Sequence, residues 1–281
     1  ENDKKFKKVR GQWCLSNISS FVTIQEGCDK FCSFCVVPFT RGAEFSRSVQ
    51  DIYDEVSDLV QKGCKEIILL GQNVNAYHGL NKDNKEVNIA KLIIDLEKIP
   101  ELHRITYTTS HPRDMNDELI NLHNNSIKLN SYLHLPVQSG SNAILKAMNR
   151  GYTSKDYLNI VNKVRNKCPD IALSSDFIVG FPGESKSDFK KTIELVKEVS
   201  FAQAYSFKYS SRPGTKSSRI KSDDICVEES NDRLHEIQEI LNKQQRCFNN
   251  KFLSKKVEVL VKGKGKKKDQ YRGTTKWMQV V

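Results

Sequence analysis

Short β-type runs alternate with helical segments from about residue 20 to residue 250, and this alternation restricts the possible folds of the 281-residue chain. Six runs are rich in β-branched and aromatic residues and have the length of strands. They cover residues 21–25, 66–70, 104–109, 132–137, 171–179 and 203–209. Strands separated by helices form a parallel sheet with right-handed crossovers. Because six strands are too few for a closed eight-stranded barrel, we expect an α/β fold with an open or partial barrel, whose chemistry lies at the carboxyl ends of the strands.

The segments between these runs have the helical period. Their apolar stripes are centred on Val56, Leu92, Val161 and Val196. Two segments follow capping boxes, Thr153-x-x-Asp156 and Ser185-x-x-Asp188. Gly63 is the expected C-cap of the first helix. A polar helix is predicted over residues 227–250, and alternating valines after Lys255 predict the start of a small β-barrel.

The charge of the chain favours a polyanionic partner. Forty-five Lys and Arg against 34 Asp and Glu give +11, with basic residues dense near both ends. Nucleic acid is the usual partner of such a chain, and the alternative is a well-solvated, lysine-rich surface. The Gly/Lys run at 262–268 is predicted to be a flexible loop that binds phosphate. No apolar run approaches the roughly 20 residues of a membrane helix, so we expect a cytoplasmic chain without membrane contacts.

Three of the eight cysteines lie close together, at Cys28, Cys32 and Cys35, directly after the first predicted strand. Such clustering favours a metal or redox site in a reducing compartment. Three thiolates at this spacing can bind three corners of a cubane [4Fe–4S] cluster and leave one iron open for a small molecule. Zinc is the alternative, although a structural zinc site normally has four protein ligands.

The C-x3-C-x2-C spacing, with Phe34 before the last cysteine, resembles the radical S-adenosylmethionine (SAM) superfamily. The resemblance implies a partial (β/α)6 barrel, a [4Fe–4S] cluster on these cysteines, and SAM chelated to the open iron. One electron from the cluster would cleave SAM to give a 5′-deoxyadenosyl radical, so the difficult chemistry would belong to the cofactors.

Further strings begin near the predicted strand ends, at 36–42, 46–48, 70–77, 108–112, 133–141, 174–184 and 209–215. Together they resemble the tRNA methylthiotransferases, most closely the MiaB type, over about residues 18–281. This family adds a methylthio group to carbon 2 of an isopentenyl-adenosine beside the tRNA anticodon, a base within a single-stranded loop. The resemblance implies a TRAM-like tRNA-binding domain at the C-terminus. A flavodoxin-like electron donor and a monomeric state are also expected.

The resemblance implies two sets of binding residues. The SAM contacts would be Phe34, Gly71, Gln72, Asn73, Ser110, Gln138, Arg150 and Asp176. Phe34 would flank the adenine, residues 71–73 the methionine amine, and Arg150 the carboxylate. The tRNA contacts would be Arg212, Lys262, Lys264, Lys266, Lys267, Lys268, Arg272 and Lys276.

The expected organisation is a linker at 1–17, a radical SAM core at 18–250 and an incomplete TRAM-like domain at 251–281. The family has a second [4Fe–4S] cluster on three cysteines of an N-terminal domain, whereas only Cys14 precedes Cys28 here. We therefore expect a fragment that would not complete sulfur transfer. Three alternatives remain at this stage: a sister enzyme acting on threonylcarbamoyl-adenosine or a ribosomal protein, a zinc-holding nucleic-acid-binding module, and an inactive fragment.

Overall fold

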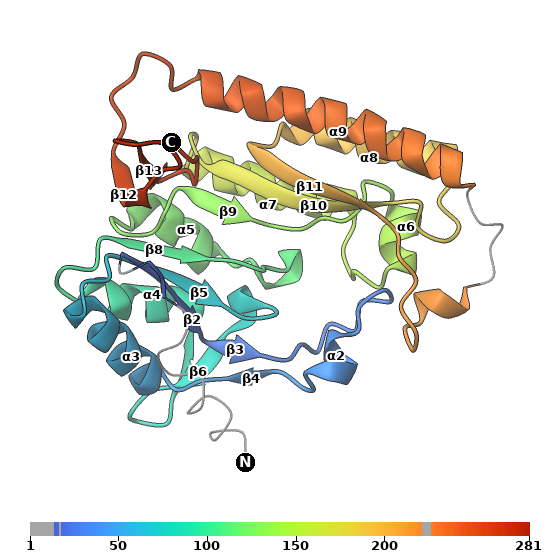
Figure 1. The fold of residues 1–281 in the computed structure, drawn as a ribbon. Coiled ribbons are helices and arrows are strands. Elements are labelled where there is room, and N and C mark those ends of the chain that lie inside the picture. Colours follow the sequence, from blue (N-terminus) through green and yellow to red (C-terminus); the bar gives the residue numbers. More distant parts are fainter. Residues whose placement is uncertain (1–13, 17, 221–225) are drawn as a thin grey trace.

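A computed structural model describes residues 14–16, 18–220 and 226–281 (Figure 1). Most of the linker predicted at 1–17, with its basic residues, lies outside the described part. All six predicted strands are confirmed. They are β2 (Ser19–Thr23), β5 (Glu66–Leu70), β8 (Arg104–Tyr107), β9 (Tyr132–His134), β10 (Ala172–Val179) and β11 (Gln203–Lys208).

The six strands form two parallel sheets, β2-β5-β8 and β9-β10-β11, and β1 (Cys14–Ser16) is antiparallel at the edge of the first. The sheets meet where Ile105 donates its N–H to Lys128 O at 2.8 Å and accepts the Asn130 N–H at 2.9 Å. Within the described ranges no ladder joins β11 back to β1 or β2. The predicted parallel α/β fold is therefore confirmed, and the sheets do not close on themselves in the described part of the chain.

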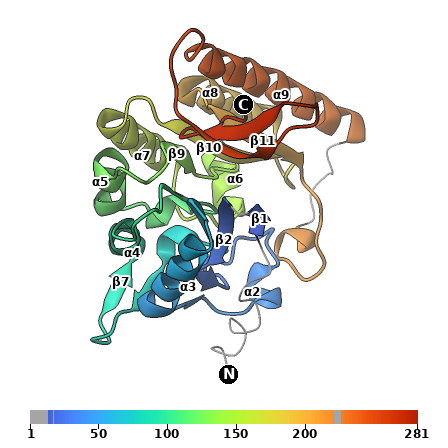
Figure 2. The same ribbon diagram turned by 60° about the vertical axis from the view of Figure 1, so that its left-hand side comes forward.

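Helices surround the two sheets in a crescent (Figures 1 and 2). They are α3 (Val49–Gln61), α4 (Ile89–Glu97), α5 (Asp117–Asn125), α6 (Asn142–Ala147), α7 (Ser154–Lys167), α8 (Lys186–Val199) and α9 (Val227–Asn250). Alternate strand residues such as Val22, Ile67 and Phe177 are fully buried in the core with these helices. The period of two in the strands thus separates a helix-packed outer face from an inner face. No helix in the described part is long and apolar enough to cross a membrane.

Smaller elements lie in the connections. They are β3 (Gln25–Glu26), α2 (Val37–Thr40), β4 (Phe45–Ser46), β6 (His78–Leu80), β7 (Glu86–Asn88), and the 3-10 turns η1 (Val74–Ala76), η2 (Pro112–Asp114) and η3 (Ser217–Arg219). Both predicted capping boxes are present, at the starts of α7 and α8. Gly63 is not the C-cap itself, which is Lys62. Gly63 follows it with φ +99° and donates to Val60 O at 2.9 Å, closing a Schellman motif.

The C-terminal hairpin consists of β12 (Val259–Lys264) and β13 (Tyr271–Thr275), and Thr274 bridges Val280. The prediction of a loop over 262–268 is wrong for its first three residues, because β12 continues through Lys264 with an irregularity before Gly263. The hairpin lies against the amino ends of the parallel strands. There Arg104, the first residue of β8, donates to Thr274 O at 2.6 Å and to Glu258 Oε1 at 3.0 Å.

A buried carboxylate also ties the hairpin to the first sheet. Glu66, the first residue of β5, is fully buried and forms an ion pair with Lys262 of β12. Ser19 donates a hydrogen bond to Glu66 Oε2 at 2.5 Å, and Asn130 approaches Glu66 Oε1 at 3.4 Å. A buried charge with these partners is stable only while they remain in place.

We predict that Lys262→Met lowers the free energy of unfolding by about 3 kcal/mol, because Glu66 then stays buried without a counter-charge. Lys264→Met is the matched control, since Lys264 is exposed on the same strand, and it should change stability by less than about 0.5 kcal/mol. Urea unfolding monitored by tryptophan fluorescence measures both values. Equal stability of the two variants would show that the ion pair does not hold the hairpin.

Candidate active site at the cysteine loop

The cysteine loop begins where β3 ends, at the carboxyl end of β2, beside the loop that follows β5. The side chain of Gln25 joins the two loops and is fully buried. Its Oε1 accepts the N–H groups of Gln72 and Asn73 at 2.9 and 3.0 Å, and its Nε2 donates to Gly27 O at 2.7 Å. One amide therefore fixes both loops relative to each other.

Gly71 and Gln72 both help to join the loop after β5 to the cysteine loop. A Cβ on Gly71 would lie 2.6 Å from Gln25 Oε1 and 2.9 Å from Gln25 O. The glycine is thus required by the close approach of Gln25, whereas the sequence prediction attributed it to a bound ligand. Gln72 Oε1 accepts the Gly27 N–H at 2.8 Å. Gln72 therefore holds the residue that precedes Cys28.

The thiols of Cys28, Cys32 and Cys35 are free and half-buried. Burial raises the pKa of Cys28, and the neighbouring thiols Cys32 and Cys35 raise it further. Burial likewise raises the pKa of Cys35. The three thiols are thus close enough to interact electrostatically. Within the described ranges, no group of three His, Cys, Asp or Glu side chains is arranged to hold a single metal ion. Cubane ligation does not require such a group, because each thiolate binds a different iron.

Arg150 reaches this loop from the turn after α6. Its Nη1 donates to Cys32 Sγ at 3.3 Å, its Nη2 to Pro136 O at 2.6 Å and its Nε to Tyr152 Oη at 2.9 Å. Arg150 is buried, with 5% of its surface exposed. Arg150 was predicted to bind the carboxylate of SAM, whereas these contacts direct it to a cysteine of the loop.

Several buried polar atoms near the loop have no hydrogen-bond partner among the residues that the structure describes: Ser33 Oγ, Asn73 Oδ1, Ser110 Oγ and His111 Nε2. The last three follow β5 and β8, and Asn73 and Lys30 are linked through Asp114. Burial lowers the pKa of His111 to about 2, so its imidazole is neutral. Unsatisfied buried polar groups in a native fold call for a partner. Their presence beside three free thiols fits a polar cofactor bound next to a metal cluster.

Three other predicted cofactor residues have structural contacts of their own. Gln138, after β9, has φ +76° and bridges β10 through its backbone. Asp176 of β10 lies 3.4 Å from His134 Nε2. Phe34 packs against a small cluster formed by Ile144, Met148 and Phe181. Phe34 therefore contributes to packing while it stays partly exposed.

Three residues of the site were not predicted from the sequence: Gln25, Lys30 and Asp114. Gln25 was placed at the end of the first strand without a role, although a polar residue two positions before Gly27-Cys28 could have suggested one. Lys30 and Asp114 are 84 residues apart in the chain and form an ion pair at 2.7 Å. No local pattern signals such a pair, because surface Lys and Asp residues are common.

The predicted tRNA contacts fall into two groups at opposite ends of the strands. Arg212 is exposed after β11, on the segment whose Ser217 N–H donates to Ser33 O of the cysteine loop at 2.9 Å. The others are on or beside the C-terminal hairpin, next to the amino ends of the strands. Six of them are exposed: Lys264, Lys266, Lys267, Lys268, Arg272 and Lys276. Lys262 differs, because it is paired with Glu66.

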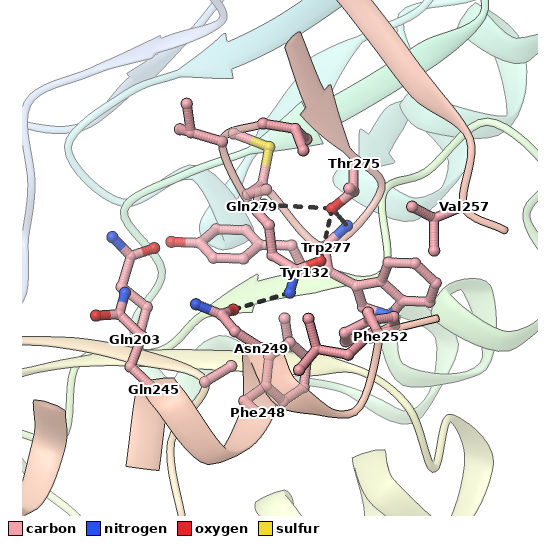
Figure 3. Close-up of a pocket in the computed structure, with 16 residues that line it drawn as sticks. Tyr132, Gln203, Gln245, Phe248, Asn249, Phe252, Val257, Thr275, Trp277 and Gln279 are labelled. Atoms are coloured by element: carbon pink, nitrogen blue, oxygen red, sulfur yellow. Dashed lines mark hydrogen bonds between the residues drawn. The ribbon is translucent and has the colours of Figure 1, made fainter. Parts of the chain in front are cut away.

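A pocket of about 520 Å³ also lies at this far end, between α9 and the hairpin (Figure 3). The first residues of β9, β10 and β11 line it, so it is separate from the cysteine loop. Trp277 packs against Phe252 with ring centroids 4.3 Å apart and ring planes tilted by 47°, and Gln279 Nε2 donates to Asn249 Oδ1 at 2.8 Å. These contacts attach the chain end to α9.

The fold and the cysteine loop define a class of protein. The family model of the Radical SAM superfamily matches residues 22–196, more than half of the chain. This chain therefore belongs to the radical SAM superfamily, and membership implies a [4Fe–4S] cluster and SAM.

The chain is 55% identical, over 94% of its length, to the tRNA-2-methylthio-N(6)-dimethylallyladenosine synthase of Neorickettsia sennetsu. It is 52% identical, over 99% of its length, to the protein of that name from Rickettsia typhi. The chain spans 55% and 62% of the lengths of these two relatives.

Solved structures share the fold at low sequence identity. The radical SAM methyltransferase TsrM from Kitasatospora setae, with cobalamin and a [4Fe–4S] cluster bound, aligns with 77% of this chain and 40% of its own. Its TM-score is 0.58 and its identity 15%. Streptococcus suis SuiB bound to SAM covers 87% of this chain and 52% of its own, with a TM-score of 0.54 and 13% identity.

We predict that Cys28→Ser, Cys32→Ser or Cys35→Ser each removes most of the iron and sulfide bound after anaerobic reconstitution, because a serine hydroxyl does not replace a thiolate ligand. Cys168→Ser is the control, since Cys168 caps α7 away from the loop, and it should bind iron as the unaltered chain does. Iron and acid-labile sulfide assays measure the loss. A colourless protein that holds zinc would exclude the cluster and support the zinc alternative.

Proposed function

We propose that this chain carries the radical SAM core of a tRNA methylthiotransferase, which modifies carbon 2 of isopentenyl-adenosine beside the anticodon. The observation that carries the proposal is the 50–55% identity to synthases of that name, over a span that includes the cysteine loop and the hairpin. The proposed cluster ligands are Cys28, Cys32 and Cys35. The six-stranded fold is proposed to act as a partial (β/α)6 barrel, with residues 18–250 as the core.

The residues around the loop have distinct tasks in this proposal. A cluster and SAM held by these residues would supply one-electron radical chemistry. Gln25 and Gln72 fix the cysteine loop. Asn73 and Ser110 offer unpaired polar atoms to SAM. Gly71 follows β5, Gln138 follows β9 and Asp176 lies within β10, and these three residues complete the proposed SAM site. Phe34 keeps its proposed place beside the adenine.

Residues 251–281 are proposed to be part of a TRAM-like domain that binds tRNA phosphates through the exposed lysines and Arg272. Arg212 is proposed to contact RNA at the other end, beside the cysteine loop. An anticodon stem-loop, a flavodoxin-like electron donor and a monomeric state complete the proposal. The sister activity on threonylcarbamoyl-adenosine remains the alternative, because it would use the same fold and cluster.

The reconstituted chain, reduced with dithionite, should convert SAM to 5′-deoxyadenosine, and Cys32→Ser should not. An anticodon stem-loop RNA with isopentenyl-adenosine should raise this rate more than the same RNA with adenosine or with threonylcarbamoyl-adenosine. Liquid chromatography with mass spectrometry measures the product. Stimulation by the threonylcarbamoyl RNA alone would favour the sister activity, and an iron-loaded protein that leaves SAM intact would contradict the proposal.

Replacing Lys266, Lys267 and Lys268 with Gln should weaken binding to this stem-loop. Binding releases fewer counterions for each phosphate contact that is lost. The slope of log K against log salt concentration should therefore become shallower by roughly 2 to 3. A matched triple variant at Lys186, Lys190 and Lys197 removes the same charge from α8 and should keep a slope close to that of the unaltered chain. Fluorescence anisotropy across a salt series measures the slopes. Equal slopes for the two triple variants would place the RNA elsewhere.

A further inference from the structure

We propose that Arg150 sets the reduction potential of the cluster through its hydrogen bond to Cys32, and that the cluster is the missing counter-ion of this buried arginine. The inference rests on the proposed cluster site at the cysteine loop and deepens it. Arg150 acts through a ligand and not on the substrate, so it is a positioning residue. Its Nη1 lies 3.3 Å from Cys32 Sγ.

Local geometry after α6 directs Arg150 to this contact. The helix has Met148 as its C-cap, and Asn149 follows with φ +58°. The Asn149 N–H donates to Lys146 O at 3.0 Å and the Arg150 N–H to Leu145 O at 2.9 Å. These two bonds form a Schellman motif with Asn in the left-handed position. The motif ends the helix sharply and directs the chain toward the cysteine loop.

The same turn holds the backbone of the cysteine loop. Met148 O accepts the Ser33 N–H at 3.0 Å. Asn149 Nδ2 donates to Phe31 O at 2.9 Å, where Phe31 has φ +49°. Three successive residues of the turn thus bind three successive residues of the loop, and Arg150 is the one that reaches a thiol. This register fixes the distance between the guanidinium and Cys32.

The buried positive charge of Arg150 also favours a cluster as its counter-ion. Arg150 is 5% exposed, and the hydrogen-bond partners of its guanidinium in the described part of the chain are a carbonyl, a hydroxyl and a thiol. No carboxylate in the described part pairs with it. Burying a cation without an anion is costly. Three thiolates bound to a cluster would supply that negative charge. Among the hydrogen-bond partners of Arg150 in the described part, Cys32 is the one that can carry it.

The contact between Arg150 and Cys32 favours the reduced state of the cluster over the oxidised state. Adding one electron to the cluster increases the negative charge on its sulfurs, and a nearby N–H donor with positive charge stabilises that state. Arg150 therefore raises the reduction potential. Removing it makes the cluster harder to reduce, without removing a ligand.

The test is an anaerobic, mediated redox titration of the reconstituted protein, followed by electron paramagnetic resonance. In Arg150→Met, the ratio of reduced to oxidised cluster at the midpoint of the unaltered protein should fall about tenfold, which is about 59 mV for one electron. Arg113→Met is the charge-matched control. Arg113 is exposed and lies beside the same turn, near Gly151, without a bond to a thiol. Its midpoint should match that of the unaltered protein.

A second measurement is the rise in melting temperature when the cluster is loaded, which should be smaller for Arg150→Met than for Arg113→Met. If Arg150→Met does not load, Tyr152→Phe provides the test, because it removes the partner of Nε and keeps the charge. It should load and shift the midpoint in the same direction by less. An unaltered protein that binds no iron would overturn the proposed cluster site. If the unaltered protein binds the cluster but the Arg150 or Tyr152 variant has the same midpoint potential, the role of Arg150 is overturned and the cluster site is not.

Discussion

The parallel pairing of β2 with β5 is the constraint on which the site depends, because it brings the loops after both strands to the same end of the fold. Gln25 converts that proximity into a fixed geometry. Its amide has one acceptor and one donor group, and the two loops use both. Gly71 is small because Gln25 occupies the space where a Cβ would lie. The position of Cys28 therefore follows from strand register and from one buried side chain.

A helix end supplies the other support of the cysteine loop. The turn after α6 is fixed by its own Schellman hydrogen bonds, which do not involve the cysteine loop. Its backbone and Asn149 side chain then bind residues 31–33, and Arg150 reaches Cys32. The loop is thus held from two sides by elements 45 or more residues away in sequence. Such support suits a loop that must present three thiols to one cofactor.

The hairpin and the cysteine loop lie at opposite ends of the parallel strands, joined by a partly polar inner face. Glu66 and Arg104, the first residues of two strands, connect that face to the hairpin. A chain that binds RNA through both Arg212 and the hairpin lysines would contact it along the length of the strands. The charge of +11 favours a polyanionic partner, but the tertiary structure decides which basic residues are available. Lys262 is a clear case, because its ammonium is already paired with Glu66.

Local patterns in the sequence determined much of this protein. The six strands, the capping boxes of α7 and α8, the long helix α9 and the three clustered cysteines were all predicted, because each depends on residues close together in the chain. The helix α5 was not predicted, since its short segment carries few apolar residues and several Asn. Tertiary structure alone decided the roles of Gln25, Lys262 and Arg150. The partners that define these roles are 47 to 196 residues away, and a buried polar side chain acquires its function only from the groups that the fold places against it.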